Sequence, residues 1–189
     1  ALESGDPVKD FDFMGITLQY ELCYTNVLNM LELAGIPLLA KDRREDFPIV
    51  VGGGPCTYNA EPLCDFFDVF SIGEGEEALC EMVRLYIEMK SSGSYTKAGY
   101  LRELSHIEGF YVPSLYRVEY NPDGTVESYA PLYPDVPGKI RKRIIKDLDA
   151  APFPDTFVMP YIETVHDRIT EEVYRGCIRG CRFCQGGMI

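Results

Sequence analysis

The sequence predicts an α/β fold in which parallel strands alternate with helices over the first hundred residues. Two patterns indicate this class: short apolar runs recur between amphipathic segments, and glycine-containing turns follow the apolar runs. The composition agrees, because 46% hydrophobic and 25% charged residues are ordinary values for a globular domain. A chain of 189 residues is long enough for one such domain and an additional segment.

Three buried strands are expected at residues 13–18, 47–51 and 69–72, because each is a short run rich in apolar residues. A helix over residues 21–35 separates the first two strands. Its apolar side chains fall largely on one stripe, and its last residue is a glycine at the usual C-cap position. A short helix near residues 61–66 precedes the third strand.

Two glycine-rich loops follow the second and third strands. Residues 52–55 are expected to form a turn, and residues 73–76 a loop that opens a helix over residues 77–90, with acidic residues complementing the helix dipole. Ligands of open α/β sheets bind at the carboxyl ends of the strands. The candidates for a ligand crevice are therefore Gly52, Gly53, Gly54, Gly73, Glu74 and Gly75. Plain turns and helix-start acids are the alternative interpretation.

The pattern changes after a further helix expected over residues 97–106. We expect an α/β domain over residues 1–109 and a β-hairpin over residues 110–133, because alternating aromatic and β-branched residues flank an Asn-Pro-Asp-Gly turn. Prolines then predict an extended connector over residues 134–167. Its basic run at residues 139–146 fits either a solvated strand edge or a patch for RNA or an acidic protein. Residues 168–189 would begin another domain with a strand and a loop.

Composition excludes several classes of function. The formal net charge of −12 disfavours binding to phosphate backbones, so nucleic acid is not an expected partner. No apolar run is long enough to cross a membrane, and no secretory signal is visible. Seven cysteines, an odd number, predict a reduced cytoplasmic protein rather than a disulfide scaffold.

Three of the cysteines are concentrated near the end of the sequence. Cys177, Cys181 and Cys184 are spaced CxxxCxxC on a loop whose glycines, Gly176 and Gly180, permit a tight backbone path. Thiolates suit iron–sulfur clusters or zinc, and a 4Fe–4S cluster held by three thiolates leaves one iron open. Three loop thiols without a metal are the alternative. The other four cysteines are expected to pack as small hydrophobic side chains.

A strand followed by CxxxCxxC, with an aromatic residue directly before the last cysteine, resembles the start of a radical S-adenosylmethionine (SAM) enzyme. The first ninety residues resemble the cobalamin-binding type of Rossmann-like (flavodoxin-like) parallel sheet that is often fused in front of that barrel. The whole chain looks like a bacterial subfamily of Fe–S oxidoreductases with this arrangement. The stretches that carry the closer likeness are residues 19–22, 26–30 and 181–185.

The resemblance implies specific roles. Cys177, Cys181 and Cys184 would ligate a 4Fe–4S cluster, its open iron would bind SAM close to Phe183, and a 5′-deoxyadenosyl radical would attack an unknown substrate. An electron donor such as a flavodoxin or ferredoxin would reduce the cluster. Cobalamin stays an open candidate, but ligation of its cobalt through a histidine of this chain is not expected, because no Asp-x-His-x-x-Gly motif is present.

Because most of that barrel is absent from the sequence, we expect residues 168–189 to supply only its first strand and cluster loop, as a truncated piece that is inactive by itself. Two other functions stay open. One is a non-catalytic module that binds a partner or a corrin, and the other is a zinc-binding domain.

Overall fold

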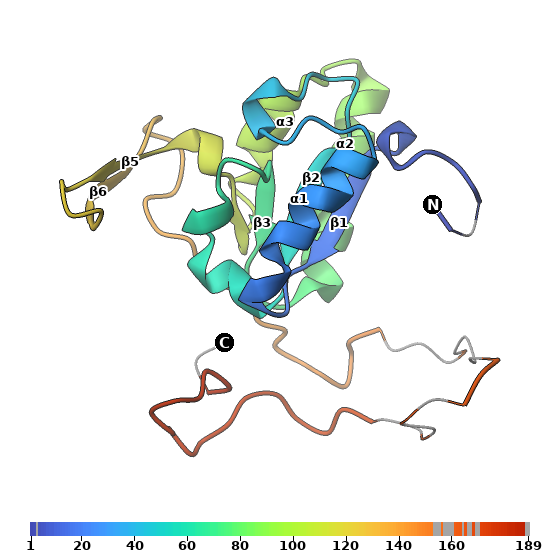
Figure 1. The fold of residues 1–189 in the computed structure, drawn as a ribbon, viewed down its shortest axis with the longest axis vertical. Helices are drawn as coiled ribbons and strands as arrows, with labels where there is room; N and C mark the ends of the chain where they lie inside the picture. Colours follow the sequence, from blue (N-terminus) through green and yellow to red (C-terminus); the bar gives the residue numbers. More distant parts are fainter. Residues whose placement is uncertain are drawn as a thin grey trace. The chain divides into compact units, whose positions relative to one another are not determined.

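The computed structural model describes residues 1–2, 4–152, 156, 161–163, 165, 168 and 171–187, and the chain divides into two units, residues 1–144 and 145–189. The helices and strands described in the first unit are β1 (Phe13–Thr17), α1 (Tyr24–Leu33), β2 (Ile49–Gly53), β3 (Val69–Ser71), α2 (Gly75–Ser92), α3 (Lys97–Leu104), β4 (Phe110–Tyr111), β5 (Tyr116–Tyr120) and β6 (Val126–Pro131) (Figure 1).

A four-stranded sheet with the order β1-β2-β3-β4 forms the centre of this unit. The first three strands are parallel, which confirms the α/β class, with Phe13 opposite Ile49 and Val51 opposite Val69. The fourth strand differs from the prediction: residues 110–111, expected in the hairpin, join the sheet antiparallel to β3. Two helices follow β3 in succession and return the chain to the carboxyl end of that strand, so the next strand runs in the opposite direction.

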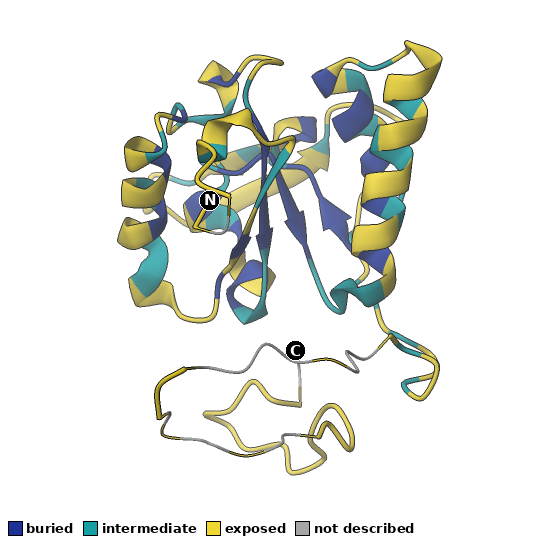
Figure 2. Ribbon diagram, turned by 90° about the vertical axis from the view of Figure 1, so that its right-hand side faces the viewer, coloured by how far each residue is buried: buried dark blue, intermediate teal, exposed yellow. Residues whose placement is uncertain are grey.

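Helices cover both faces of the sheet, with α1 on one face and α2 on the other (Figure 2). Val27 and Leu31 are the buried residues of α1, and Ala78 and Met82 those of α2. The middle strands β2 and β3 are buried along almost their whole length, as expected for strands covered on both sides. Burial therefore explains why they read as continuous apolar runs in the sequence.

Glycines end the two longer helices. Gly35 and Gly93 both have a positive φ, and the residue after each donates a backbone hydrogen bond back to Leu31 or Met89. The start of α2 lies at Gly75, two residues before the prediction. In place of the helix expected at residues 61–66 the structure has a 3-10 turn at Glu61–Leu63, and a second 3-10 turn precedes it at Pro55–Asn59.

The hairpin of β5 and β6 confirms the prediction from the Asn-Pro-Asp-Gly turn. Gly124 takes the positive φ of the turn, and the Asn121 N–H donates to the Thr125 carbonyl at 2.8 Å. The rings of Tyr116 and Tyr129 stack across the two strands with centroids 4.9 Å apart.

The proline-rich segment packs more closely than an extended connector would. Val136 is 3% exposed, the Tyr116 hydroxyl donates to the Pro137 carbonyl at 2.8 Å, and Arg102 forms a forked ion pair with Asp135. Residues 134–144 thus belong to the first unit. Among the described helices, none is both long and apolar enough to cross a membrane.

The second unit has no regular helix or strand among its described residues. The strand expected at residues 168–174 is absent from residues 171–174, which are exposed, while residues 169 and 170 lie outside the described residues. A strand takes its backbone partners from neighbouring strands, and the described part of this unit offers none.

Candidate functional site

The first two glycines of the predicted crevice do not form a turn. Gly52 and Gly53 lie inside β2, and the chain turns only at Gly54, whose φ is +93°. A Cβ atom at residue 52 would lie 2.7 Å from the ring of Phe70. The small residue at position 52 is therefore explained by packing against a core ring.

The loop after β3 is covered by the chain itself. The Arg143 N–H donates to the Ile72 carbonyl at 2.9 Å, and the Arg143 carbonyl accepts from the Glu74 N–H at 3.0 Å. A Cβ atom at Gly73 would lie 2.2 Å from the Arg143 carbonyl oxygen. The backbone of residue 143 thus fills the space directly beside Gly73. Ligand binding at the other predicted crevice residues stays a prediction.

The Arg143 side chain fixes this segment to α2. Its guanidinium donates to Glu77 Oε2 at 2.6 Å and to Glu81 Oε1 at 2.7 Å, and its side chain is only 16% exposed. These two hydrogen bonds raise the Arg143 pKa. We name residues 142–144 the strap, because they join the end of β3 to α2.

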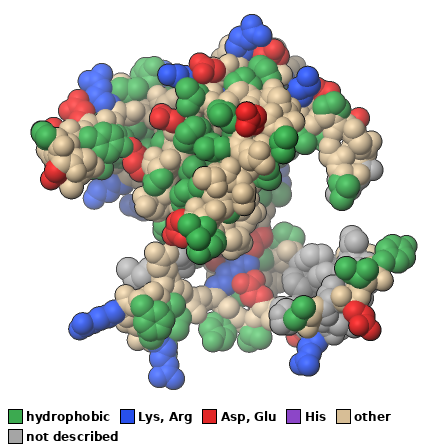
Figure 3. Space-filling model, viewed as in Figure 1, with side chains coloured by type: hydrophobic (Ala, Val, Ile, Leu, Met, Phe, Trp, Pro, Cys, Tyr) green, Lys and Arg blue, Asp and Glu red, His purple; other side chains and the backbone are tan. Residues whose placement is uncertain are grey.

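The strap alters the interpretation of the basic run. Arg143 faces two carboxylates of its own chain, so it contributes neither to an open basic patch nor to a fully solvated edge. On the face shown in Figure 3, acidic and basic side chains of residues 1–144 are scattered among apolar ones. This face offers no continuous basic surface of the kind that nucleic acids bind.

The three cysteines of the CxxxCxxC motif are all exposed. The Arg179 N–H donates to Cys177 Sγ at 3.5 Å, and the Gly186 N–H donates to Cys184 Sγ at 3.4 Å. Gly176 and Gly180 have positive φ, as the tight loop requires. Within the described residues, no three metal-ligating side chains converge on one position, these cysteines included.

The remaining cysteines only partly match the prediction that they pack. Cys56 is buried, Cys23 and Cys64 are half-buried, and Cys80 is exposed on α2. Burial raises the pKa of the Cys64 thiol to about 12, even though it contacts the Tyr111 hydroxyl at 3.7 Å. Cys64 is consequently a neutral thiol at physiological pH.

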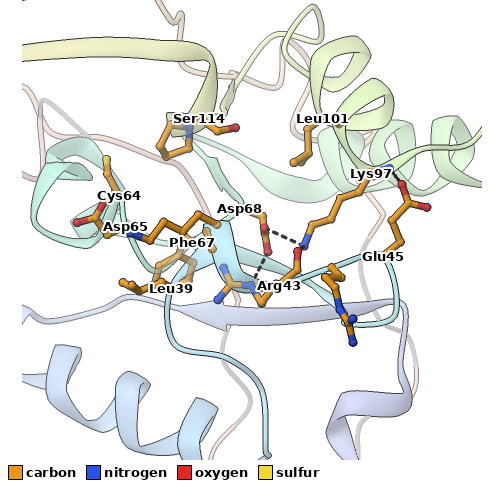
Figure 4. Close-up of a pocket in the computed structure, with 15 residues that line it drawn as sticks. Leu39, Arg43, Glu45, Cys64, Asp65, Phe67, Asp68, Lys97, Leu101 and Ser114 are labelled. Carbon is orange, nitrogen blue, oxygen red and sulfur yellow. Dashed lines mark hydrogen bonds and ion pairs between the residues drawn. The ribbon is translucent and has the colours of Figure 1, made fainter.

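A cavity of about 530 Å³ opens at the amino ends of β2 and β3 (Figure 4). The glycine loops follow the carboxyl ends of the same strands, at the opposite end of the sheet. Asp68, directly before β3, is its central charge. Asp68 Oδ2 accepts from Arg43 Nε at 3.1 Å and from the Val50 N–H at 2.8 Å, and Oδ1 lies 3.0 Å from Lys97 Nζ. Burial lowers the pKa of Arg43, an effect that the nearby Asp68 carboxylate opposes.

None of the three residues in this buried cluster is among the site residues expected from the sequence. Arg43 lies in a charged stretch that looks solvated, and Lys97 begins a polar helix. The signal that could have found it is Asp68 itself, a carboxylate placed between Phe67 and the apolar strand β3, since a charge at such a position needs a buried partner.

Comparison with known proteins gives two matches. The family model described as "Radical SAM proteins, N-terminal" matches residues 1–113. An uncharacterized protein of Methanocaldococcus jannaschii is 31% identical over 186 residues, which cover 97% of this chain and 32% of that protein. The chain thus spans about a third of the length of this relative. No solved structure matches the chain.

Proposed function

Because the chain belongs to the family of radical SAM proteins, through the N-terminal region that its members share, we propose that it is the N-terminal part of a radical SAM enzyme. In this proposal Cys177, Cys181 and Cys184 hold a 4Fe–4S cluster. The observation that carries the proposal is the family match over residues 1–113 together with a CxxxCxxC motif downstream of it in the same chain. When bound, the cluster supplies the electron that cleaves SAM to a 5′-deoxyadenosyl radical in the whole protein.

The loop residues support ligation of such a cluster by their chemistry. Cluster ligands must be thiolates, and a backbone N–H that donates to sulfur stabilises the negative charge. Two of the three sulfurs already accept such a bond, from Arg179 and Gly186. All three thiols are exposed, so iron and sulfide can reach them. The loop has to close further to bring the three sulfurs onto one cluster.

Positive charge around the loop offsets the anionic cluster in this proposal. Arg179 and Arg182 lie within the motif and are exposed. Arg175 is engaged differently, because its guanidinium forms a forked ion pair with Glu172 at 2.8 Å. The position of Phe183 beside SAM stays a prediction; in the described structure its side chain is 93% exposed.

The proposal extends to the compartment and the electron source. All seven cysteines are free, which fits a reducing compartment such as the cytoplasm. A one-electron donor such as a flavodoxin or ferredoxin would reduce the cluster. The substrate is left open.

Anaerobic reconstitution of the full-length protein tests the proposal directly. We expect a stoichiometric 4Fe–4S cluster by iron and sulfide analysis, and 5′-deoxyadenosine release when SAM and a reductant are added. Cys181→Ser should lose the cluster, whereas Cys80→Ser, which changes an exposed cysteine outside the motif, should retain it. Bound zinc without iron would contradict the proposal, and so would a cluster that survives the Cys181→Ser change.

A further inference from the structure

The cavity at the amino ends of β2 and β3 has the size of a small-molecule site. Its volume of about 530 Å³ falls in the usual range of such sites, roughly 300–1,000 Å³. Leu39, Phe67 and Leu101 provide apolar wall, and Figure 4 shows them around the same space as the Asp68 cluster. An apolar cavity with a few polar groups on one wall is the usual form of an organic ligand site.

The buried charges of this wall do not balance. Arg43 and Lys97 carry two positive charges with side-chain exposures of 0% and 10%, while Asp68, 3% exposed, carries one negative charge. The four exposed charged residues of the lining, two positive and two negative, cancel in sign; they are Lys41, Arg44, Glu45 and Asp65. Of these, Glu45 accepts a hydrogen bond from the Lys97 backbone N–H at 3.1 Å. One positive charge is therefore left over in the least solvated part of the cavity, in a chain whose net charge is −12.

Hydrogen bonding places this excess on Lys97. The Arg43 guanidinium is completely buried and uses four of its five N–H donors, one on Asp68 and three on the carbonyls of Pro37, Leu38 and Phe66 at 2.8–2.9 Å. The Lys97 ammonium has three N–H donors but two acceptors in the described part of the chain, Asp68 Oδ1 at 3.0 Å and the Arg43 carbonyl at 3.5 Å. One donor of a nearly buried ammonium group can thus serve a ligand.

From this arrangement we propose that the cavity binds a small organic anion. Its carboxylate or phosphate group would accept a hydrogen bond from Lys97 Nζ, and its apolar body would lie against Phe67 and Leu101. Cys64 also lines the cavity and is a neutral thiol, so it does not repel an anion. The site lies at the end of the sheet opposite the strap. The proposal does not depend on the iron–sulfur cluster proposed above.

The test uses the 189-residue chain and matched probes, 4-phenylbutyrate and its neutral amide, 4-phenylbutyramide. We expect the acid to bind with a dissociation constant of about 1 mM or tighter, and to shift the amide NMR signals of Ala98, Leu101 and Ser114, which line the cavity. The amide probe should bind at least about 10-fold more weakly, because it forms no charge-assisted hydrogen bond.

Three variants separate ligand binding from folding. Ala98 is exposed in the first turn of α3 and lines the cavity, and Glu and Gln have similar size there. Ala98→Glu places a negative charge beside the site and should weaken the acid about 10-fold relative to Ala98→Gln, while both variants keep the wild-type melting temperature. Lys97→Met leaves Arg43 and Asp68 as a neutral pair and should weaken the acid to a similar degree.

Several results would overturn the proposal: no binding of the acid, equal affinity for acid and amide, equal affinity of the Ala98→Glu and Ala98→Gln variants, or signal shifts outside the cavity. A radical SAM activity of the full-length protein has no bearing on these outcomes, and its absence would not affect them.

Discussion

Replacing Asp68 by alanine is expected to destabilise the protein more than almost any other single change of a charged residue. The carboxylate accepts hydrogen bonds from Arg43 and Val50 and pairs with Lys97. Its removal leaves two cations facing each other in a wall where their side chains are 0% and 10% exposed. Breaking a buried ion pair in this way costs about 3–5 kcal/mol, because the remaining charges are uncompensated.

That cost is a large part of the free energy of unfolding of a domain, which is about 5–15 kcal/mol. Urea unfolding followed by circular dichroism measures it, with Asp46→Ala as the matched control. Asp46 pairs with Arg44 at 3.4 Å, and these side chains are 60% and 81% exposed. The control should therefore change the free energy of unfolding by less than about 0.5 kcal/mol.

A double variant makes the reasoning sharper. Asp68→Ala combined with Lys97→Met removes one of the two uncompensated cations, so it should cost less than the sum of the single changes. The explanation would be refuted if Asp68→Ala lost no more stability than Asp46→Ala. Strict additivity of the Asp68 and Lys97 changes would refute it as well.

Single contacts give three further predictions. Arg143→Ala should increase the rate of tryptic cleavage within residues 139–146 about 10-fold, because the strap opens more often without its ion pairs. An unchanged rate would contradict the inference that these ion pairs hold the strap on α2. Gly73→Ala should lower the free energy of unfolding, measured with urea, by at least about 1–3 kcal/mol, because φ at this position is +99° and the new Cβ meets the Arg143 carbonyl. As the control, Gly138→Ala should be nearly neutral, because no atom lies within 4 Å of a Cβ at that position. Burial raises the pKa of Cys64 in the folded state from 9.0 to about 12. The unfolded state therefore releases this proton first, and the free energy of unfolding should fall as the pH rises from about 9 to about 12. Cys64→Ala should flatten that decline, and an equal decline in the wild-type and variant proteins would contradict the role of Cys64.

Features encoded by neighbouring residues could be predicted from the sequence. The apolar runs that became β2 and β3, the helix end at Gly35 and the hairpin turn that contains Gly124 each depend on a few consecutive residues. Local chemistry decides such elements, because a buried strand needs an unbroken apolar run and a left-handed turn favours glycine.

Features that depend on distant residues could not be predicted. Gly73 looks like a ligand-binding glycine in the sequence, yet its small size serves the backbone of Arg143, seventy positions further along. The buried cluster of Arg43, Asp68 and Lys97 is assembled from three segments, and no spacing rule connects them. The motifs indicate the family resemblance, and the match over residues 1–113 bears out its coarse part.

The strap has a consequence for where this protein can be cut or recombined. A piece that ends at residue 133 loses Arg143 and leaves Glu77 and Glu81, four positions apart on α2, as like charges without their shared cation. It also loses Val136, whose side chain is almost completely buried. A piece that ends at residue 144 keeps both. Gene fusions that join this unit to a different C-terminal partner should therefore carry residues 134–144 with it, because this stretch, which reads as linker, completes the fold.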